Sequence, residues 1–203
     1  MKQVLLIGDS IREGYCEQVK ELLKNDYEVI YPPVNCRSSQ AIIISLHNWV
    51  TITRPEDVEF VHFNCGQWDT GRFYNDKYPL TEPKEYKRNL GMIIRILNKL
   101  FPNAQVIIAT TTPMNPDDKE ALDKALVEPN PALILHPRTT KDVIKYNKIV
   151  KNVAKEYNVT VNDLYKTVNK FDGSYFIDCA HLTKDGYDIL AKKIVKLIKK
   201  LRR

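Results

Sequence analysis

The sequence predicts an α/β fold in which a parallel sheet carries helices on both of its faces. Two observations predict it. Short apolar runs of strand length alternate along the chain with segments whose apolar residues repeat at helical spacing. The first run, residues 4–7, is wholly apolar, as expected of a strand that is buried on both faces. Strands that alternate with helices pair in parallel through right-handed crossovers, so the carboxyl ends of the strands share one edge of the sheet.

Five strands are expected from these runs. The second run ends at Pro32 and Pro33, which have no N–H to donate to a neighbouring strand. The fifth run, "VTVND", is the shortest and lies between two helical patterns. The expected strands comprise residues 4–7, 27–31, 58–64, 104–112 and 159–163.

The helical patterns between these strands have identifiable starts. Pro83 suits the first turn of a long helix, because an N–H at that position would have no partner within the helix. Thr183 is placed to cap the C-terminal helix through its hydroxyl. The expected helices cover residues 11–24, 40–50, about 83–101 and 140–157, a short segment after the fifth strand, and the C-terminal segment.

Length and composition favour one domain over residues 1–203, because 43% of the residues are apolar and no linker or internal repeat interrupts the pattern. Residues 113–137 contain five prolines and are expected to form a long variable loop near the edge where the strands end. The sequence has neither a signal peptide nor an apolar run long enough to span a membrane. A cytoplasmic protein is therefore expected.

The formal net charge of +6 does not by itself indicate a nucleic-acid partner. Much of the excess lies in "AKKIVKLIKKLRR", where basic residues flank an apolar stripe, as is typical of a solvated helix face. We therefore expect no nucleic-acid binding. Cys16, Cys36, Cys65 and Cys179 are far apart in the sequence, which favours reduced thiols over disulfides or a metal site.

Ser10 follows the first predicted strand, where it either caps the next helix or faces a substrate. Ligands of parallel α/β sheets bind beyond the carboxyl ends of the strands, which favours the second role. A nucleophilic serine needs a base, and the base needs a carboxylate that orients it. His181 precedes the final helix, and Asp178 lies three residues upstream, a spacing that allows a carboxylate–imidazole hydrogen bond. These three residues form the candidate catalytic triad, whereas His47 and His62 are expected to be structural.

Four stretches of the chain are similar to segments of a known family. They are "GDS" after the first strand, "FNCGQWD" after the third, "DVIKYNKIVKNVAKEYNVTVNDLYKTV", and "DCAHLTKDGYDILA" before the last helix. Together they resemble the SGNH, or GDSL-type, hydrolases. The resemblance implies a flavodoxin-like three-layer α/β/α sandwich with a central five-stranded parallel sheet. It also implies hydrolysis of carboxylic esters without metal or cofactor, through an acyl-enzyme, with Ser10 as nucleophile, His181 as base and Asp178 as its orienting partner.

The second block of the family supplies a glycine whose N–H lines the oxyanion hole, but "VNCRSS" contains no glycine here. A backbone donor needs no particular side chain, so Asn35, Cys36 and Arg37 are all candidates, of which Cys36 is favoured. The N–H of Ser10 is a further candidate, because a helix N-terminus favours negative charge.

The third block also departs from the family pattern. Its usual form is G-x-N-D, whereas this chain has Trp68 in place of the asparagine. Asn64, two residues before Gly66, is the expected side-chain donor to the oxyanion. Gln67 is its competitor.

The substrate is expected to be a small-molecule ester. Trp68 and Phe73 offer flat apolar surfaces that suit sugar rings, which favours an acetylated sugar, although packing within the loop explains both aromatics equally well. Asp9 lies beside the nucleophile and is a candidate at the substrate site, but it is expected to tie down the loop rather than to react. Arg12 is expected at the surface, with contact to an anionic substrate as its alternative. Alternatives to a sugar esterase are a lysophospholipase or acyl-thioesterase of the same fold, and a non-catalytic binding protein, which the irregular oxyanion blocks favour and the retained triad opposes.

Overall fold

The computed structural model describes residues 1–72, 76–117 and 138–202, which are built around one sheet of five strands. The strands are β1 (Gln3–Ile7), β2 (Glu28–Ile30), β3 (Val58–Phe63), β4 (Gln105–Ala109) and β5 (Thr160–Asn162). Their order across the sheet is β2-β1-β3-β4-β5, and every neighbouring pair is parallel. The predicted fold class and the flavodoxin-like order are confirmed.

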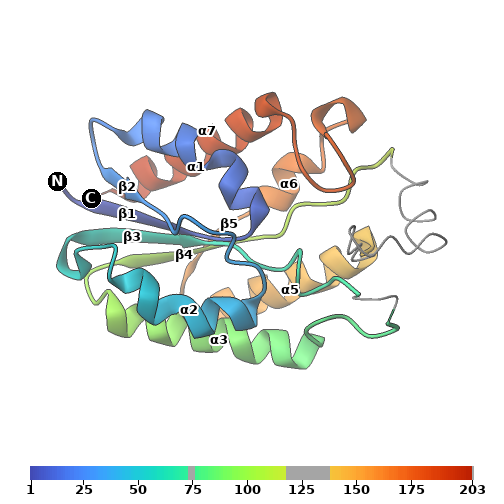
Figure 1. The fold of residues 1–203 in the computed structure, drawn as a ribbon, viewed down its shortest axis with the longest axis horizontal. Coiled ribbons are helices and arrows are strands. Elements are labelled where there is room, and N and C mark those ends of the chain that lie inside the picture. Colours follow the sequence, from blue (N-terminus) through green and yellow to red (C-terminus); the bar gives the residue numbers. More distant parts are fainter. Residues whose placement is uncertain (73–75, 118–137, 203) are drawn as a thin grey trace.

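Helices cover both faces of the sheet and complete three layers (Figure 1). On one face lie α1 (Ser10–Leu23), α6 (Leu164–Val168) and α7 (Lys184–Leu201), and on the other lie α2 (Ser39–Val50), α3 (Pro83–Leu100) and α5 (Thr140–Glu156). Two predicted helix starts are confirmed, since α3 begins at Pro83 and Thr183 caps α7 by accepting from the N–H of Gly186.

The side chains of β1 alternate between two apolar cores, as the two-residue period of a strand requires. Val4 and Leu6 pack against the layer of α1 and α7, whereas Leu5 and Ile7 pack against the opposite layer. All four are fully buried, and each such side chain stabilises the fold by about 1.5–3 kcal/mol. The strand that leads into Ser10 is therefore firmly held from both sides.

The third and fourth strands end earlier than the sequence pattern predicts, so Asn64 and Thr111 lie in loops beyond the sheet. Thr111 illustrates the cause, because its backbone bonds to a side chain and not to a strand. Its N–H donates to Asn147 Oδ1 at 2.8 Å, and Asn147 Nδ2 donates back to its carbonyl oxygen at 2.8 Å. Polar loop residues thus form the carboxyl edge of the sheet.

The loop expected at 113–137 is described only up to residue 117. Its first part follows the carboxyl edge, where the N–H of Asn115 donates to the carbonyl oxygen of Cys179 at 2.9 Å. Both chain termini lie at the opposite end of the molecule (Figure 1). Within the described ranges, no helix combines the length and apolar composition needed to cross a membrane.

Candidate active site

Ser10 lies where β1 ends and α1 begins, at the point where the strand order changes direction. β1 is flanked by β2 and β3, an arrangement that opens a crevice at the carboxyl ends of the strands. Asp9, not Ser10, is the N-cap of α1, because its Oδ1 accepts from the N–H of Ile11 at 3.0 Å. Ser10 is the first helical residue, and its own N–H is one of the amides that have no acceptor within the helix. A capping role therefore does not account for this serine.

The three predicted catalytic side chains form one hydrogen-bonded chain. Ser10 Oγ lies 2.7 Å from His181 Nε2, and His181 Nδ1 lies 2.7 Å from Asp178 Oδ2. Asp178 Oδ1 also accepts from the backbone N–H groups of Ala180, at 2.8 Å, and of His181, at 2.7 Å. The loop before α7 thus holds the carboxylate, and the carboxylate directs the imidazole toward the serine. Both links have the length expected between a nucleophile, its base and the orienting group.

The charges around His181 favour its role as a proton acceptor. Burial would raise the pKa of Asp178, but hydrogen bonds from the His181 ring and from two loop amides outweigh it and lower the pKa to about 2. The hydrogen bond to this carboxylate raises the pKa of His181 above its ordinary value, against desolvation and the positive charge of Arg138. An imidazole with a raised pKa accepts a hydroxyl proton more readily.

Asn64 lies against Asp9, in the loop that follows β3. Its Nδ2 donates to Asp9 Oδ1 at 2.8 Å, and its Oδ1 accepts from the hydroxyl of Tyr15 at 3.0 Å. Asp9 is fully buried, and burial raises its pKa despite hydrogen bonds from Asn64 and Ile11. Asp9 has no exposed surface; it holds the loop that carries Ser10 against the loop after β3 and does not face a substrate in this structure.

The loop that was expected to supply a backbone donor to the oxyanion uses its amides locally. The N–H of Cys36 donates to the carbonyl oxygen of Gly8 at 3.0 Å, and that of Arg37 donates to Asn35 Oδ1 at 2.9 Å. The favoured role of Cys36 does not fit this geometry, because pairing with Gly8, in the loop that carries Ser10, occupies its N–H. Arg37 has a φ of +55°, in the left-handed region that favours glycine. The loop thus adopts a glycine-type conformation without a glycine.

Asp69, to which the sequence assigned no role, joins the loops that follow β2 and β3. Both of its carboxylate oxygens accept from the N–H of Ser39 at 3.1 Å, and Oδ1 accepts from the Ser39 hydroxyl at 2.5 Å. Asp69 is fully buried, and burial raises its pKa to about 6 despite these bonds. Because Ser39 begins α2, this carboxylate fixes the start of that helix beside the site. The only signal for it was its place at the end of the third block.

Gln67 is engaged within the loops. Its Nε2 donates to the carbonyl oxygen of Thr112 at 2.8 Å and to the hydroxyl at 3.2 Å. Arg138 donates to the backbone oxygen of Gln67 and, at 3.2 Å, to its Oε1. Gln67 is therefore disfavoured as the oxyanion donor. The sequence did not indicate a role for Arg138, because this residue lies outside all four family-like stretches. In the structure, its positive charge interacts with the carboxylates of Asp9 and Asp178.

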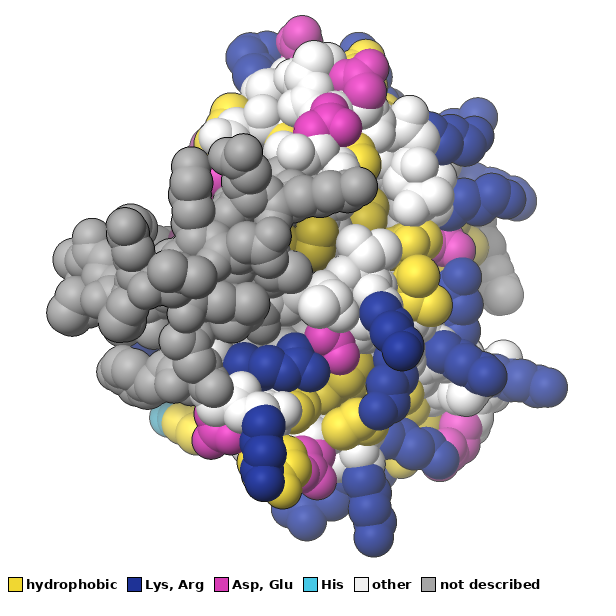
Figure 2. Space-filling view, turned by 90° about the vertical axis from the view of Figure 1, so that its right-hand side faces the viewer, with side chains coloured by type: hydrophobic (Ala, Val, Ile, Leu, Met, Phe, Trp, Pro, Cys, Tyr) yellow, Lys and Arg dark blue, Asp and Glu magenta, His cyan; other side chains and the backbone are white. Residues whose placement is uncertain are grey.

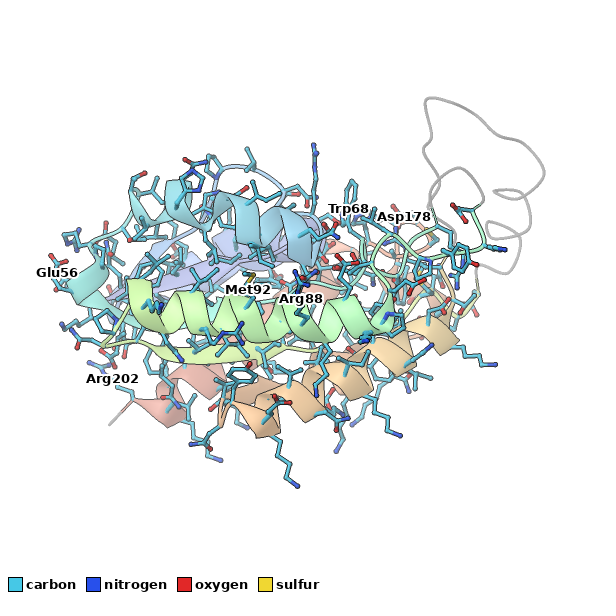
Figure 3. All side chains as sticks on the ribbon, turned by 90° about the horizontal axis from the view of Figure 1, so that it is seen from below. Glu56, Trp68, Arg88, Met92, Asp178 and Arg202 are labelled. Atoms are coloured by element: carbon cyan, nitrogen blue, oxygen red, sulfur yellow. The ribbon has the colours of Figure 1, made fainter. Side chains whose placement is uncertain are left out.

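Of the two aromatics expected at the substrate site, the structure describes Trp68 alone, because Phe73 lies outside the described residues. Trp68 is half-buried and lies at the same end of the molecule as Asp178 (Figure 3). The guanidinium of Arg37 lies over its ring, 5.7 Å from the ring centroid. An aromatic surface is thus present at the edge of the sheet that carries the triad.

The expectation that Arg12 lies at the surface is wrong. Arg12 is only 2% exposed, and its guanidinium donates to the carbonyl oxygen of Val34 at 2.5 Å. The same group lies over the ring of Tyr31, 5.8 Å from its centroid. Arg12 therefore holds the start of α1 against the loop after β2, a contact between segments that local spacing does not reveal.

Metal-ligating residues do not cluster in the part of the chain that the structure describes, where no group of three or more His, Cys, Asp or Glu could hold an ion. All four cysteines are reduced. Cys65, within the loop that follows β3, is buried, and burial raises its pKa well above the ordinary value, so its thiol is protonated at neutral pH.

The fold of this chain is similar to the folds of several solved structures. No protein-family model matches the sequence, and no curated protein is significantly similar to it. Among solved structures, a lipase/acylhydrolase from Enterococcus faecalis has a TM-score of 0.74 and 20% identity, over 98% of this chain and 96% of that one. Axe2, an acetylxylan esterase from Geobacillus stearothermophilus, has a TM-score of 0.72 and 18% identity, over 97% and 94%. A member of the lipolytic G-D-S-L family from Veillonella parvula has a TM-score of 0.68 and 20% identity, over 99% and 100%. The shared fold therefore extends over nearly the whole chain.

Proposed function

We propose that this chain is a serine hydrolase of the SGNH, or GDSL, type that cleaves carboxylic esters through an acyl-enzyme. The observation that carries the proposal is the hydrogen-bonded chain from Ser10 through His181 to Asp178, with 2.7 Å at both side-chain links. The fold shared with proteins named as an esterase and an acylhydrolase supports the reaction class. A purely binding role is disfavoured, because binding alone needs no imidazole directed at a serine hydroxyl.

Ester cleavage on this geometry begins when His181 Nε2 takes the proton of Ser10 as Oγ attacks the carbonyl carbon. Asp178 stays charged and stabilises the imidazolium that forms. The tetrahedral intermediate collapses as the bond between the carbonyl carbon and the alcohol oxygen breaks, and His181 gives its proton to the leaving alkoxide. Water then attacks the acyl carbon with His181 as base, which releases the carboxylic acid and restores Ser10.

The negative oxygen of the intermediate accepts hydrogen bonds from the N–H of Ser10 and from the side chain of Asn64. The N–H of Ser10 stands at the N-terminus of α1, where the helix dipole favours negative charge. Asn64 Nδ2 has two hydrogens, one of which is donated to Asp9 at 2.8 Å. The second is available to the oxyanion. Donors of this kind act because they are fixed before the charge develops.

Among esters, we favour a small acetylated sugar as the substrate. The ring of Trp68 lies at the same end as Asp178, and sugars pack well against aromatic faces. The end of the molecule that carries the triad faces the viewer in Figure 2, where apolar and basic side chains lie side by side. One of the structural neighbours is named as an acetylxylan esterase. The other named activity, that of a lipase/acylhydrolase, makes a longer-chain ester the second candidate.

A substrate panel separates the two candidates. We expect acetylated xylo-oligosaccharides and p-nitrophenyl acetate to be hydrolysed with the highest kcat/KM, and activity to fall as the acyl chain of p-nitrophenyl esters lengthens. Trp68→Ala should raise KM for the acetylated sugar and leave KM for p-nitrophenyl acetate unchanged, because only the sugar uses the ring. Highest activity on long-chain p-nitrophenyl esters or lysophosphatidylcholine would replace the sugar with a lipid. Failure to hydrolyse any ester in the panel would contradict the proposed function.

The rate is expected to fall at acid pH with an apparent pKa above 6.5, the ordinary value for histidine. Below that pKa His181 is protonated and cannot accept the proton of Ser10; above it the ring is neutral and active. Asp178 and Asp9 displace the pKa of His181 upward, whereas Arg138 displaces it downward. Arg138→Gln should therefore move the acid limb to higher pH. The measurement is kcat/KM for p-nitrophenyl acetate between about pH 5 and pH 9. A flat profile would exclude His181 as the base.

A further inference from the structure

A chain of buried polar side chains crosses the core and ends beside the nucleophile. Asn162 Nδ2 lies 3.2 Å from His62 Nε2, and His62 Nδ1 lies 3.5 Å from the hydroxyl of Tyr15. Tyr15 donates to Asn64 Oδ1 at 3.0 Å, and Asn64 Nδ2 donates to Asp9 Oδ1 at 2.8 Å. None of the five residues is more than 4% exposed. The chain therefore connects β5 and β3 to the loop that holds Ser10.

The hydrogen bonds of this chain have one consistent direction. Tyr15 has a single hydroxyl proton, and the amide oxygen of Asn64 can only accept it. The oxygen of Tyr15 is then the acceptor for His62, which must carry its proton on Nδ1 and leave Nε2 to accept from Asn162. Burial lowers the pKa of His62 to about 4, so the ring is neutral, as this tautomer requires. Each donor thus fixes the orientation of the next group up to the carboxylate of Asp9.

We propose that Tyr15, held in turn by His62, is a positioning residue that orients Asn64 for the oxyanion hole. The inference rests on the proposed function, in which Asn64 Nδ2 meets the oxyanion. Among the described residues, Tyr15 is the only hydrogen-bond donor to Asn64 Oδ1, so without it the amide is held at one end alone. The terminal torsion of asparagine is broad, and the donor would then move away from the reacting oxygen.

The packing around Asn64 supports this role. A Cβ on Gly8 would lie 2.1 Å from Asn64 Oδ1, so the amide occupies the space that a side chain at position 8 would take. The amide is therefore pressed against the nucleophile loop on one side and bonded to Tyr15 on the other. A buried polar chain is costly to desolvate, and apolar side chains would fill this part of the core without that cost. These polar side chains end beside Ser10, and a role in positioning groups there accounts for their being polar and not apolar.

Steady-state kinetics of Tyr15→Phe test the proposal, with p-nitrophenyl acetate as substrate. We expect kcat to fall about 10- to 100-fold and KM to stay unchanged. A misplaced oxyanion donor stabilises the transition state less and leaves substrate binding as it was. Asn64→Ala should lower kcat by about 10²–10³-fold. Because Tyr15 acts through Asn64, the double variant Tyr15→Phe/Asn64→Ala should be no slower than Asn64→Ala.

Tyr27→Phe is the matched control. Tyr27 is 2% exposed and donates to Glu59 at 3.0 Å, a bond of the same length near the amino ends of the strands, and its loss should leave kcat unchanged. If Tyr15→Phe folds poorly, His62→Gln serves as a second variant, because it removes the contact between His62 and the Tyr15 hydroxyl. We expect His62→Gln to lower kcat less than Tyr15→Phe does, and to have no further effect in an Asn64→Ala background. The proposal is overturned if Tyr15→Phe keeps the kcat of the parent, or if the losses from Tyr15 and Asn64 multiply in the double variant. The proposed function is judged separately, by turnover of the parent protein and labelling of Ser10 with a fluorophosphonate.

Discussion

Ser10→Ala is expected to remove ester turnover, with a loss of at least about 10⁴-fold in kcat. Alanine deletes the attacking oxygen, which lies 2.7 Å from His181 Nε2, but keeps the backbone N–H at the start of α1. Binding and oxyanion contacts therefore remain while the covalent step is lost. Steady-state hydrolysis of p-nitrophenyl acetate measures the loss, and intact-mass analysis after fluorophosphonate treatment measures labelling.

Two controls make this result specific to the nucleophile. The thermal unfolding midpoint of Ser10→Ala should match that of the parent, because Asp9 caps α1 and the serine hydroxyl is not needed for the helix. Ser45→Ala, on the half-buried face of α2, should keep full turnover and labelling. Turnover within about tenfold of the parent, or unchanged labelling of Ser10→Ala, would place the nucleophile at another residue.

The contacts among Ser10, His181 and Asp178 could be predicted from the sequence because they depend on local features, whereas the catalytic roles of these residues stay a prediction. Asp178 and His181 are three residues apart in one loop, and their contact needs only a turn of irregular backbone. Ser10 follows a strand whose apolar run is unmistakable, and parallel strands bring their carboxyl ends to one edge. The contact between Ser10 and His181, 171 residues apart, then follows from the order of elements.

Candidate donors to an oxyanion can be named from the sequence only in part, because the direction of a backbone N–H is set by tertiary pairing. The position of Cys36 in the second-block stretch favours it as a backbone donor. Its N–H pairs with the carbonyl oxygen of Gly8, however, a contact that no spacing in the sequence indicates. Asn64 is proposed from its place near Gly66, and its role as an oxyanion donor stays a prediction. Its partners Tyr15 and Asp9 were not found, since they lie 49 and 55 residues away on other elements.

Buried and half-buried charged side chains were the residues that sequence reasoning missed most consistently. Arg12 and Asp69 are buried and Arg138 is half-buried, whereas sequence patterns favour a solvated position for such side chains. Each is held by groups remote in sequence, such as Ser39 for Asp69 at a separation of 30 residues and Gln67 for Arg138 at 71. Burial of a charge depends on such partners, and a single sequence does not show them.

Asp178→Asn is expected to lower kcat by about 10³–10⁴-fold, although the side chain keeps its size and shape. Asp178 Oδ1 accepts from the N–H groups of Ala180 and His181, at 2.8 and 2.7 Å, so the oxygen of an asparagine must take that position. Its NH₂ group then takes the place of Oδ2, which lies 2.7 Å from His181 Nδ1. Because an NH₂ group donates, Nδ1 must become the acceptor and the ring proton moves to Nε2. An Nε2 that carries a proton cannot take one from Ser10.

The pH profile of the same variant separates loss of the orienting acceptor from a general loss of structure. The hydrogen bond to the carboxylate is the largest cause that raises the pKa of His181, so the residual activity of Asp178→Asn should show its acid limb at lower pH than the parent. Asp188→Asn is the matched control, because Asp188 pairs with Lys184 at 2.8 Å on the surface of α7 and should be dispensable. A kcat within about tenfold of the parent for Asp178→Asn, with an unmoved acid limb, would show that Ser10 and His181 act as a dyad without the carboxylate.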